Sequence, residues 1–231
     1  MREIVLDTET TGLDPTDGHR LVEIGCIELI NHLCTGKTYH QYINPERDMP
    51  AGAFDVHGLS ESFLSGFPVF PEIANTFIEF IGEDPLIIHN AKFDLGFLNA
   101  ELKRAGKPII PGSQTVDTVL MARRVFPGAP ASLDALCRRY GIDNSARTNH
   151  GALLDAELLA DVYLELRGGR EPDLTFAPTE SEGLPQTGES HRLRTIQRVA
   201  RPPRAHSLTP EEHSAHKSFI ETLNKPLWNK L

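Results

Sequence analysis

Three apolar segments stand close together near the start of the chain, and their spacing constrains the fold more than any other feature. Residues 3–6 form a short apolar run, residues 21–30 alternate apolar and polar side chains, and residues 37–43 contain two tyrosines and an isoleucine. Each pattern is typical of a β-strand. Because few residues separate the three segments, no helical crossover fits between them, and we expect an antiparallel, hairpin-like arrangement.

The chain then changes to an alternation of helical and strand patterns. Apolar residues recur at helical spacing in several segments, and two short apolar runs between them predict further strands. Ser132 is a plausible N-cap for one of the helices. The fold class is therefore mixed α/β. The predicted helices cover residues 71–81, 93–104, 119–126, 132–140 and 152–166, and the predicted strands cover residues 86–88 and 116–118.

Beyond Gly168 the sequence loses its periodicity and becomes rich in proline and glycine. Such composition is typical of a flexible linker. A last helix is expected to follow Thr209, because Thr209-Pro-Glu-Glu212 combines an N-cap, a proline at the first helical position and the glutamate of a capping box. We therefore expect three parts: a domain over residues 1–168, a flexible linker over 169–207, and a C-terminal docking helix within 208–231.

The overall charge limits the classes of partner. The formal net charge is −9, so the chain should bind nucleic acid poorly by phosphate contacts alone. If the substrate is DNA or RNA, bound metal ions would have to supply positive charge at the site. No apolar run is long enough to span a membrane, and the acidic N-terminus lacks a signal-peptide core. We expect a cytoplasmic protein without membrane contact.

The strongest local motif is Asp7-Thr-Glu9-Thr-Thr-Gly12, directly after an apolar strand. Alternate residues of a strand share a face, so Asp7 and Glu9 should point the same way. Two carboxylates held close repel each other, and a divalent cation between them reduces that cost. The alternative is a pair of ordinary surface acids on an exposed strand face.

Two further motifs carry ionisable residues at element boundaries. Asp94, in His89-Asn-Ala-Lys-Phe-Asp94, lies where a buried strand opens onto a helix, which is a frequent ligand site in α/β folds. It could equally be an acid favoured by the helix dipole. His150 precedes the helix that contains Asp155, and it could fold over a site that Asp155 faces or be a plain loop residue.

Taken together, Asp7, Glu9, Asp94, His150 and Asp155 resemble the DEDD exonuclease superfamily in its histidine variant. Further segments resemble the family of proofreading epsilon subunits of bacterial DNA polymerase III, so that the similarity covers nearly the whole chain. The resemblance implies a ribonuclease H-like fold, a mixed sheet flanked by helices, followed by a tail with a short helix. The further segments are Val56–Gly58, Ser132–Cys137, Thr148–Asp155, Thr195–Arg198 and Glu211–His216.

The resemblance also implies a chemistry, namely hydrolysis of phosphodiester bonds from a 3′ end with release of 5′-mononucleotides. The four carboxylates would hold two divalent metal ions, Mg²⁺ or Mn²⁺, and His150 would be the general base. Asp7, Glu9, Thr10, His57 and Phe93 would contact the 3′-terminal nucleotides. We expect His57 to lie in a loop. For Phe93, core packing is the stronger interpretation.

The implied partners are DNA with a single-stranded 3′ end and the catalytic (alpha) subunit of the polymerase. The C-terminal tail would dock on that subunit through Phe219, Ile220, Leu223 and Trp228. Leu174 and Phe176 belong to a segment that looks like the sliding-clamp motif of the family. Glu171 stands where that motif has glutamine, so a chance match is as good an interpretation.

Two other functions remain open from the residues alone. A free-standing exoribonuclease would use the same catalytic set, although it would have no need of a docking helix. A catalytically silent polymerase adaptor would use the domain as a scaffold, and it should bind Mn²⁺ weakly or not at all.

Overall fold

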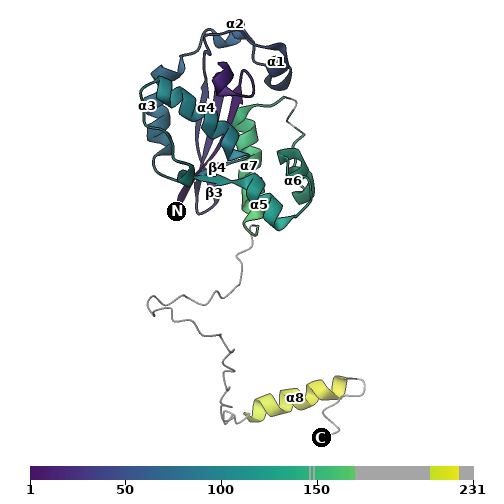
Figure 1. Ribbon diagram of the computed structural model, residues 1–231. Coiled ribbons are helices and arrows are strands. Elements are labelled where there is room, and N and C mark those ends of the chain that lie inside the picture. Colours follow the sequence, from purple (N-terminus) through teal and green to yellow (C-terminus); the bar gives the residue numbers. More distant parts are fainter. Residues whose placement is uncertain (146, 148, 170–208, 224–231) are drawn as a thin grey trace, which may run out of the picture. The chain divides into compact units, whose positions relative to one another are not determined.

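The computed structural model describes residues 1–145, 147, 149–169 and 209–223. The chain divides into two units, Met1–Phe176 and Ala177–Leu231 (Figure 1). The first unit contains the sheet and the helices packed on it. The second contains one described helix.

A five-stranded mixed sheet with the order β3-β2-β1-β4-β5 forms the centre of the first unit. The first three strands pair antiparallel, as their spacing predicted, and β4 and β5 run parallel to β1. The strands are β1 (Arg2–Thr10), β2 (Leu21–Ile30), β3 (Leu33–Tyr42), β4 (Leu86–Ile88) and β5 (Thr115–Asp117).

Helices cover both faces of this sheet, and the alternation of β1 assigns its side chains to the two sides. Ile4 and Leu6 pack in a core with α3 and α4, whereas Val5 packs in a second core with α5, α6 and α7. The expected sheet flanked by helices is confirmed. The helices are α3 (Phe70–Ile81), α4 (Ala91–Arg104), α5 (Thr118–Val125), α6 (Leu133–Tyr140) and α7 (Ala152–Leu166).

Two short helices, α1 (Ala51–His57) and α2 (Glu61–Leu64), lie between β3 and α3 and were not predicted. The loop expected around His57 is therefore wrong, because His57 is the last residue of α1. No side chain caps the start of α1, so the sequence carries no N-terminal signal there. Its end is fixed by Gly58, which has a left-handed conformation with φ of 72°.

The second unit contains α8 (Pro210–Thr222), which begins at the predicted capping box. Thr209 Oγ1 accepts the N–H of Glu212, and the Glu212 carboxylate accepts the N–H of Thr209. Phe219 on this helix and Leu223 directly after it are exposed, at 60% and 36%. Trp228, Leu174, Phe176 and Glu171, with nearly all of the expected linker, lie outside the described residues. None of the described helices is long and apolar enough to cross a membrane.

Candidate active site

The carboxylates of β1 lie on the face of the sheet that α7 covers. Asp7 and Glu9 alternate in register with Val5, whose side chain belongs to the α7 core. Opposite Asp7 on β2 stands Gly25. A Cβ atom there would lie 2.3 Å from the backbone of Ala152, so glycine is what allows the first turn of α7 to approach the sheet.

Asp155 lies in this first turn of α7 and is 3% exposed. Its backbone N–H donates to the carbonyl of Gly151 at 2.8 Å. The preceding loop is anchored because the N–H of His150 donates to the carbonyl of Val56 on α1 at 3.1 Å. His150 Nδ1 then lies 3.2 Å from Asp155 Oδ2, while the rest of the imidazole is half-exposed.

Asp94 reaches the same place from the opposite face of the sheet. It sits in the first turn of α4, which follows β4 after Asn90 in a left-handed conformation. Thr8, whose side chain lies on the α4 side of β1, donates its hydroxyl to Asp94 Oδ1 at 2.7 Å. Asp94 is 3% exposed, so this hydrogen bond is shielded from water.

These residues surround one cavity of about 290 Å³. The structure therefore brings together the four carboxylates and the histidine that the sequence singled out from three separate segments. Ligand atoms of Glu9, His150 and Asp155 lie within 4.8 Å of one another. The cavity is lined by Asp7, Thr8, Glu9, His89, Phe93, Asp94, Ser132, Leu133, Asp134, Arg147, His150 and Asp155.

Burial raises the pKa values of three of these carboxyl groups, and repulsion from neighbouring carboxylates adds to the shift. Burial and then the nearby Asp155 raise the pKa of Glu9 to about 8. Burial and the Asp94 carboxylate raise the pKa of Asp7 well above its usual range. Burial raises that of Asp94, although the Thr8 hydroxyl opposes the shift. Such a cluster needs protons or bound cations to offset its negative charge.

One cation comes from the chain itself, and the sequence analysis missed it. Arg147 Nε lies 2.5 Å from Asp155 Oδ1, and its Nη2 lies 2.6 Å from Asp155 Oδ2 and 2.7 Å from His150 Nδ1. Its Nη1 lies 2.7 Å from Asp134 Oδ1. Thr8 and Asp134 were also missed. Only Asp134 carried a signal, since it stands in a segment that resembles the epsilon family.

A neighbouring cleft of about 600 Å³ contains the predicted substrate contacts Thr10, His57 and Phe93. The Thr10 hydroxyl donates to the carbonyl of Gly12 at 2.6 Å, which shapes the turn after β1. His57 is 5% exposed, and burial lowers its pKa. Its Nδ1 accepts the N–H of Leu59, and its buried Nε2 meets no hydrogen-bond partner in the described part of the chain.

Phe93 fits both interpretations that the sequence offered. One side of the ring packs on the α3–α4 core and lies 5.1 Å from the Phe97 ring. The side chain is nevertheless only partly buried and lines both the acidic cavity and the neighbouring cleft. It forms part of the wall between the two.

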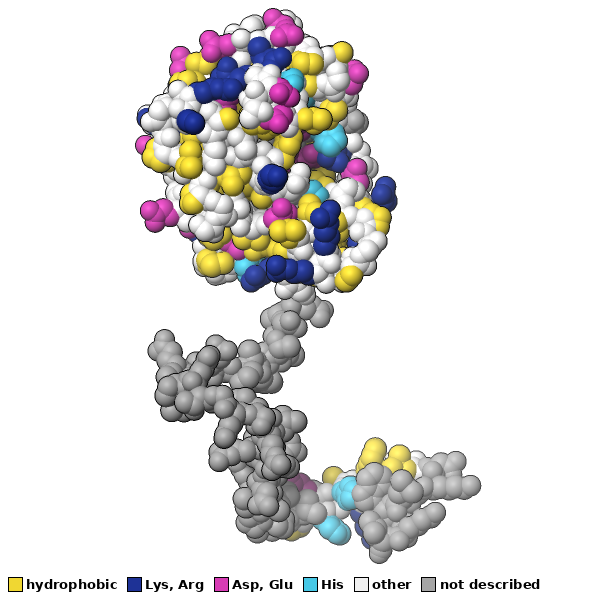
Figure 2. Space-filling model, viewed as in Figure 1, with side chains coloured by type: hydrophobic (Ala, Val, Ile, Leu, Met, Phe, Trp, Pro, Cys, Tyr) yellow, Lys and Arg dark blue, Asp and Glu magenta, His cyan; other side chains and the backbone are white. Residues whose placement is uncertain are grey.

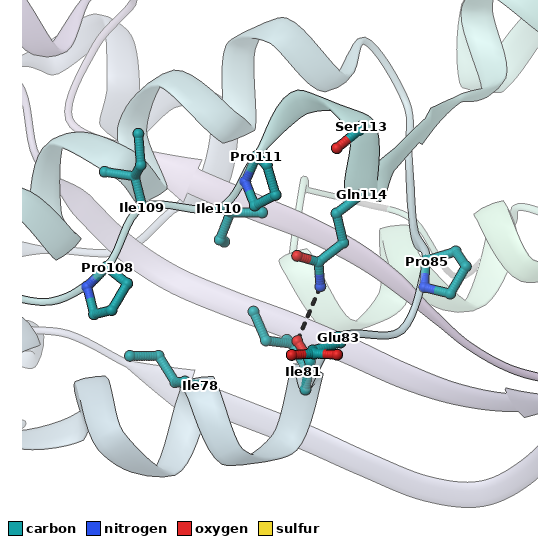
Figure 3. Close-up of a pocket in the computed structure, with 11 residues that line it drawn as sticks. Ile78, Ile81, Glu83, Pro85, Pro108, Ile109, Ile110, Pro111, Ser113 and Gln114 are labelled. Carbon is teal, nitrogen blue, oxygen red and sulfur yellow. Dashed lines mark hydrogen bonds between the residues drawn. The ribbon is translucent and has the colours of Figure 1, made fainter.

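A third hollow of about 580 Å³ lies beside α3 and is different in kind (Figure 3). Its walls are mostly isoleucine and proline, and Gln114 closes one end by donating to the carbonyl of Gly82 at 2.9 Å. Glu83 is the only ionisable residue among those that line it. The hollow has no cluster of reactive groups and is not a candidate for catalysis.

Comparisons with known proteins agree with this site. The exonuclease family model RNase_T matches residues 4–163. The DNA polymerase III subunit epsilon of Rickettsia felis is 48% identical over 230 residues, which are 97% of this chain and 98% of the relative. The subunit epsilon of Escherichia coli K12 is 44% identical over 235 residues, with 97% and 94% covered. This chain belongs to the DNA polymerase III epsilon family.

The epsilon-family chain shares its fold with solved exonuclease structures. The nuclease domain of 3′hExo, a DEDDh family member bound to rAMP, superimposes with a TM-score of 0.62 at 18% identity, covering 72% of this chain and 91% of that domain. The expected ribonuclease H-like fold is thereby confirmed. Exonucleases of this fold use divalent metal ions, and the buried carboxylates of the epsilon-family chain are suited to hold them.

The surface charge of the epsilon-family chain is consistent with a local rather than a general attraction for nucleic acid. On the face seen in Figure 2, Lys and Arg side chains are scattered among acidic ones rather than gathered in one patch. The net charge is −9. Phosphate groups would therefore have to be attracted at the site itself.

Proposed function

We propose that this chain is a 3′→5′ DNA exonuclease that proofreads the primer end for the replicative polymerase in the cytoplasm. The observation that carries the proposal is the convergence of Asp7, Glu9, Asp94, His150 and Asp155 on one cavity, in a member of the epsilon family. The product would be a 5′-mononucleotide from each hydrolysed phosphodiester bond.

Asp7, Glu9, Asp94 and Asp155 would hold two divalent ions, Mg²⁺ or Mn²⁺. The side chains that line the cavity suit such ions. Carboxylate oxygens are hard ligands that these ions prefer, and the raised pKa of Glu9 indicates a site in which negative charge lacks compensation. When bound, such ions supply an activated water and stabilise the leaving 3′ oxygen.

His150 is the proposed general base, and its surroundings suit that role. Its Nδ1 lies 2.7 Å from Arg147 Nη2 and 3.2 Å from Asp155 Oδ2, and it accepts from the guanidinium in this arrangement because arginine can only donate. When the guanidinium leaves Nδ1, the Asp155 carboxylate would fix the ring orientation and favour the tautomer with the proton on Nδ1. Nε2 is then the nitrogen that can accept a proton from water. The half-exposed ring and its anchored loop allow it to cover the cavity without sealing it.

The neighbouring cleft would hold the unpaired 3′ end of the DNA. Thr10, His57 and Phe93 line it and would contact the terminal nucleotides. Asp7 and Glu9 would contact the scissile phosphate region through the cavity that adjoins this cleft. Stacking on an aromatic ring is sequence-tolerant, so removal of nucleotides should depend little on base identity.

The C-terminal part would supply the partners. We propose that three apolar residues at the end of α8 dock on the catalytic (alpha) subunit of the polymerase, together with Trp228. They are the exposed Phe219 and Leu223 and the partly buried Ile220. Tethering would keep the exonuclease at high effective concentration near the primer end. A contact of Leu174 and Phe176 with the sliding clamp is the weaker part of this proposal, because Glu171 departs from the motif.

The test is a nuclease assay with purified full-length protein on 5′-labelled single-stranded DNA, with Mn²⁺ or with EDTA. We expect shortening from the 3′ end with Mn²⁺ only. Asp7→Ala should abolish it, and His150→Ala should weaken it by roughly 100-fold or more. His213→Ala, which replaces an exposed histidine of α8, is the matched control and should be fully active.

Other outcomes would point to the other two functions. Equal rates on labelled RNA and DNA, together with no binding to the polymerase catalytic subunit, would favour a free-standing exoribonuclease. A folded protein that shortens neither strand and binds no Mn²⁺ would favour a silent adaptor.

A further inference from the structure

Arg147 pairs with one of the carboxylates that the chemistry proposed above assigns to a metal ion. It comes from the loop before α7, and its side chain is only 9% exposed. The guanidinium donates hydrogen bonds to both carboxylate oxygens of Asp155, with N–O distances of 2.5 and 2.6 Å. A two-pronged pairing of this kind is the strongest geometry for an arginine and a carboxylate.

The carboxylate that Arg147 grips is also a candidate metal ligand. An oxygen of Asp155 lies within 4.8 Å of ligand atoms of Glu9 and His150. A divalent ion on Asp155 would therefore meet a guanidinium that already uses both oxygens, and the two cations would repel each other.

Arg147 has a second partner that does not belong to the candidate ligand set. Its Nη1 lies 2.7 Å from Asp134 Oδ1, at the N-terminus of α6. Asp134 is 47% exposed and is held in place by Asn144, whose Nδ2 donates to the same oxygen at 3.1 Å. A guanidinium that releases Asp155 can thus keep an ion pair within the same cavity.

We infer that Arg147 is the resident counter-ion of the metal-free site and exchanges with the metal: it holds Asp155 when no ion is bound and withdraws toward Asp134 when one binds. This inference rests on the proposed function, since it needs Asp155 to be a metal ligand. Arg147 thereby lowers the affinity for the metal and stabilises the acidic cluster when the metal is absent.

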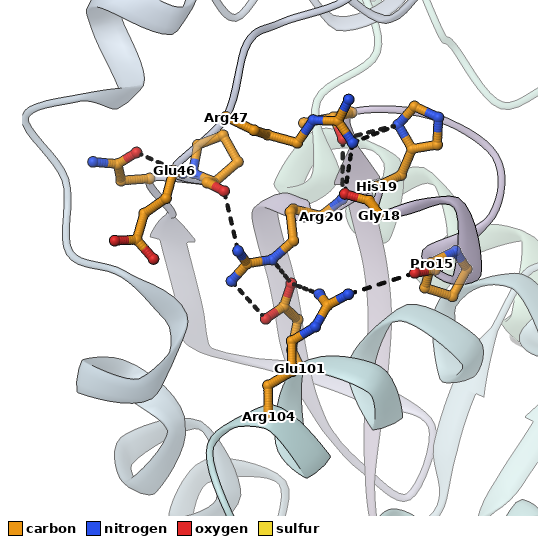
Figure 4. A network of polar contacts seen from close by, with 11 residues as sticks. Pro15, Gly18, His19, Arg20, Glu46, Arg47, Glu101 and Arg104 are labelled. Atoms are coloured by element: carbon orange, nitrogen blue, oxygen red, sulfur yellow. Dashed lines mark hydrogen bonds and ion pairs between the residues drawn. The ribbon is translucent and has the colours of Figure 1, made fainter.

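A second arginine pairs with both oxygens of a buried carboxylate outside the acidic cavity, and it serves as a control. Arg20 Nε and Nη2 lie 2.5 and 3.0 Å from the two oxygens of Glu101, and Arg104 adds a contact to the same carboxylate (Figure 4). Glu101 is buried like Asp155, but it does not line the acidic cavity. Replacing Arg20 therefore shows what the loss of a buried arginine–carboxylate pair does when no candidate metal ligand is involved.

The experiment measures Mn²⁺ binding to the full chain without DNA, by the electron paramagnetic resonance signal of free Mn²⁺, and thermal unfolding with and without Mn²⁺. Arg147→Gln should bind Mn²⁺ about tenfold more tightly than the wild type, a change of roughly 1.4 kcal/mol. Its metal-free form should unfold at a lower temperature, and saturating Mn²⁺ should reduce that difference. Arg20→Gln should lower the unfolding temperature and leave Mn²⁺ affinity unchanged.

Variants of Asp134 provide a second, independent test of the exchange. Asp134→Asn should weaken Mn²⁺ binding, because the withdrawn guanidinium loses its partner. In the Arg147→Gln background the same change should have a much smaller effect, so the two residues should couple in a double-mutant cycle. Arg147→Lys keeps the charge but loses the fork, and it should fall between the wild type and Arg147→Gln.

Several results would overturn the inference. Unchanged or weaker Mn²⁺ binding by Arg147→Gln would mean that the arginine does not compete with the metal, even if the wild type binds the ion and digests DNA. If Arg147→Gln does not fold, Arg147→Lys carries the test, and unchanged affinity there has the same meaning. A wild type that binds no Mn²⁺ would instead remove the metal site from the proposed function, and the inference with it.

Discussion

A Cβ atom on Gly25 would lie 2.3 Å from the backbone of Ala152, although the two residues are far apart in the sequence. Gly25 is paired with Asp7 across β1 and β2, and Ala152 begins the helix that contains Asp155. The absence of one side chain on β2 thus sets the distance between carboxylates from two elements. The site depends on a residue that has no reactive group.

Gly25→Ala should therefore impair catalysis more than folding. The clash is with backbone atoms, so α7 has to shift away from the sheet. We expect a loss of stability of about 1–3 kcal/mol from overpacking and a fall in nuclease rate of roughly 100-fold from displacement of Asp155. Thermal unfolding and single-turnover digestion of single-stranded DNA measure the two effects. Gly112→Ala, where a Cβ meets open space, is the control. A Gly25→Ala enzyme with a normal rate would contradict this role.

Thr8→Val should weaken the site by releasing Asp94. Thr8 Oγ1 donates to Asp94 Oδ1 at 2.7 Å in a buried setting, and valine keeps the shape but has no hydroxyl. A buried acceptor that loses its donor costs about 1–3 kcal/mol. We expect weaker Mn²⁺ binding and roughly tenfold slower digestion, corresponding to the lower end of that range. Thr8→Ser keeps the hydroxyl, so it should retain the Mn²⁺ affinity and the digestion rate of the wild type. If the valine variant digests DNA as fast as the serine variant, the hydroxyl does not position Asp94.

Much of this architecture could be predicted from local patterns. The alternation that places Asp7 and Glu9 on one strand face, and the short spacing that makes the first strands antiparallel, are properties of neighbouring residues. The capping box at Thr209 likewise acts within one turn. Physical rules that link residues a few positions apart are readable in a sequence.

The features that could not be predicted depend on contacts between distant segments. His57 lies on α1, which has no side-chain cap and whose end is set by Gly58; there an added Cβ would meet the side chain of Asn149 at 2.5 Å. Arg147 was missed because nothing in its own segment marks a buried partner. Its role follows only once α6 and α7 bring Asp134 and Asp155 around it.

Glu9 should make the metal-free protein less stable as the pH rises. Its pKa is about 8 in the folded chain against 4.5 ordinarily, so the folded state prefers the protonated form. A raised carboxyl pKa contributes stability that is present below about pH 4.5 and lost as the pH rises toward 8. Glu9→Gln removes this dependence. We expect the variant, treated with EDTA, to match the wild type near pH 4.5 and to exceed it by on the order of 2–4 kcal/mol at pH 8.

Denaturant unfolding at several pH values, with EDTA present throughout, measures this difference. Adding Mn²⁺ at pH 8 should stabilise the wild type more than Glu9→Gln, since the ion offsets a charge that the variant lacks. Glu61→Gln, at an exposed position on α2, is the control and should follow the wild type at every pH. A constant difference between Glu9→Gln and wild type from acid to alkaline pH would show that Glu9 has no raised pKa.

Phe219→Asp should separate the two tasks of the chain. Phe219 is 60% exposed on α8, and a charge there opposes burial against an apolar partner surface. We expect binding to the cognate polymerase catalytic subunit to weaken at least about tenfold, as for a central interface residue. Digestion of free single-stranded DNA should stay at the wild-type rate, because all residues that line the acidic cavity belong to the first unit.

Ser214→Asp adds the same charge about 140° around the helix from Phe219, given 100° per residue, and therefore tests whether one face of α8 makes the contact. It should bind the polymerase subunit like the wild type. Surface plasmon resonance with the immobilised catalytic subunit measures both affinities. Equal losses for the two variants would mean that added charge, not the Phe219 face, weakens the complex. No loss for either would place the contact outside α8, and Trp228→Ala in the full chain would then show whether the terminal segment makes it.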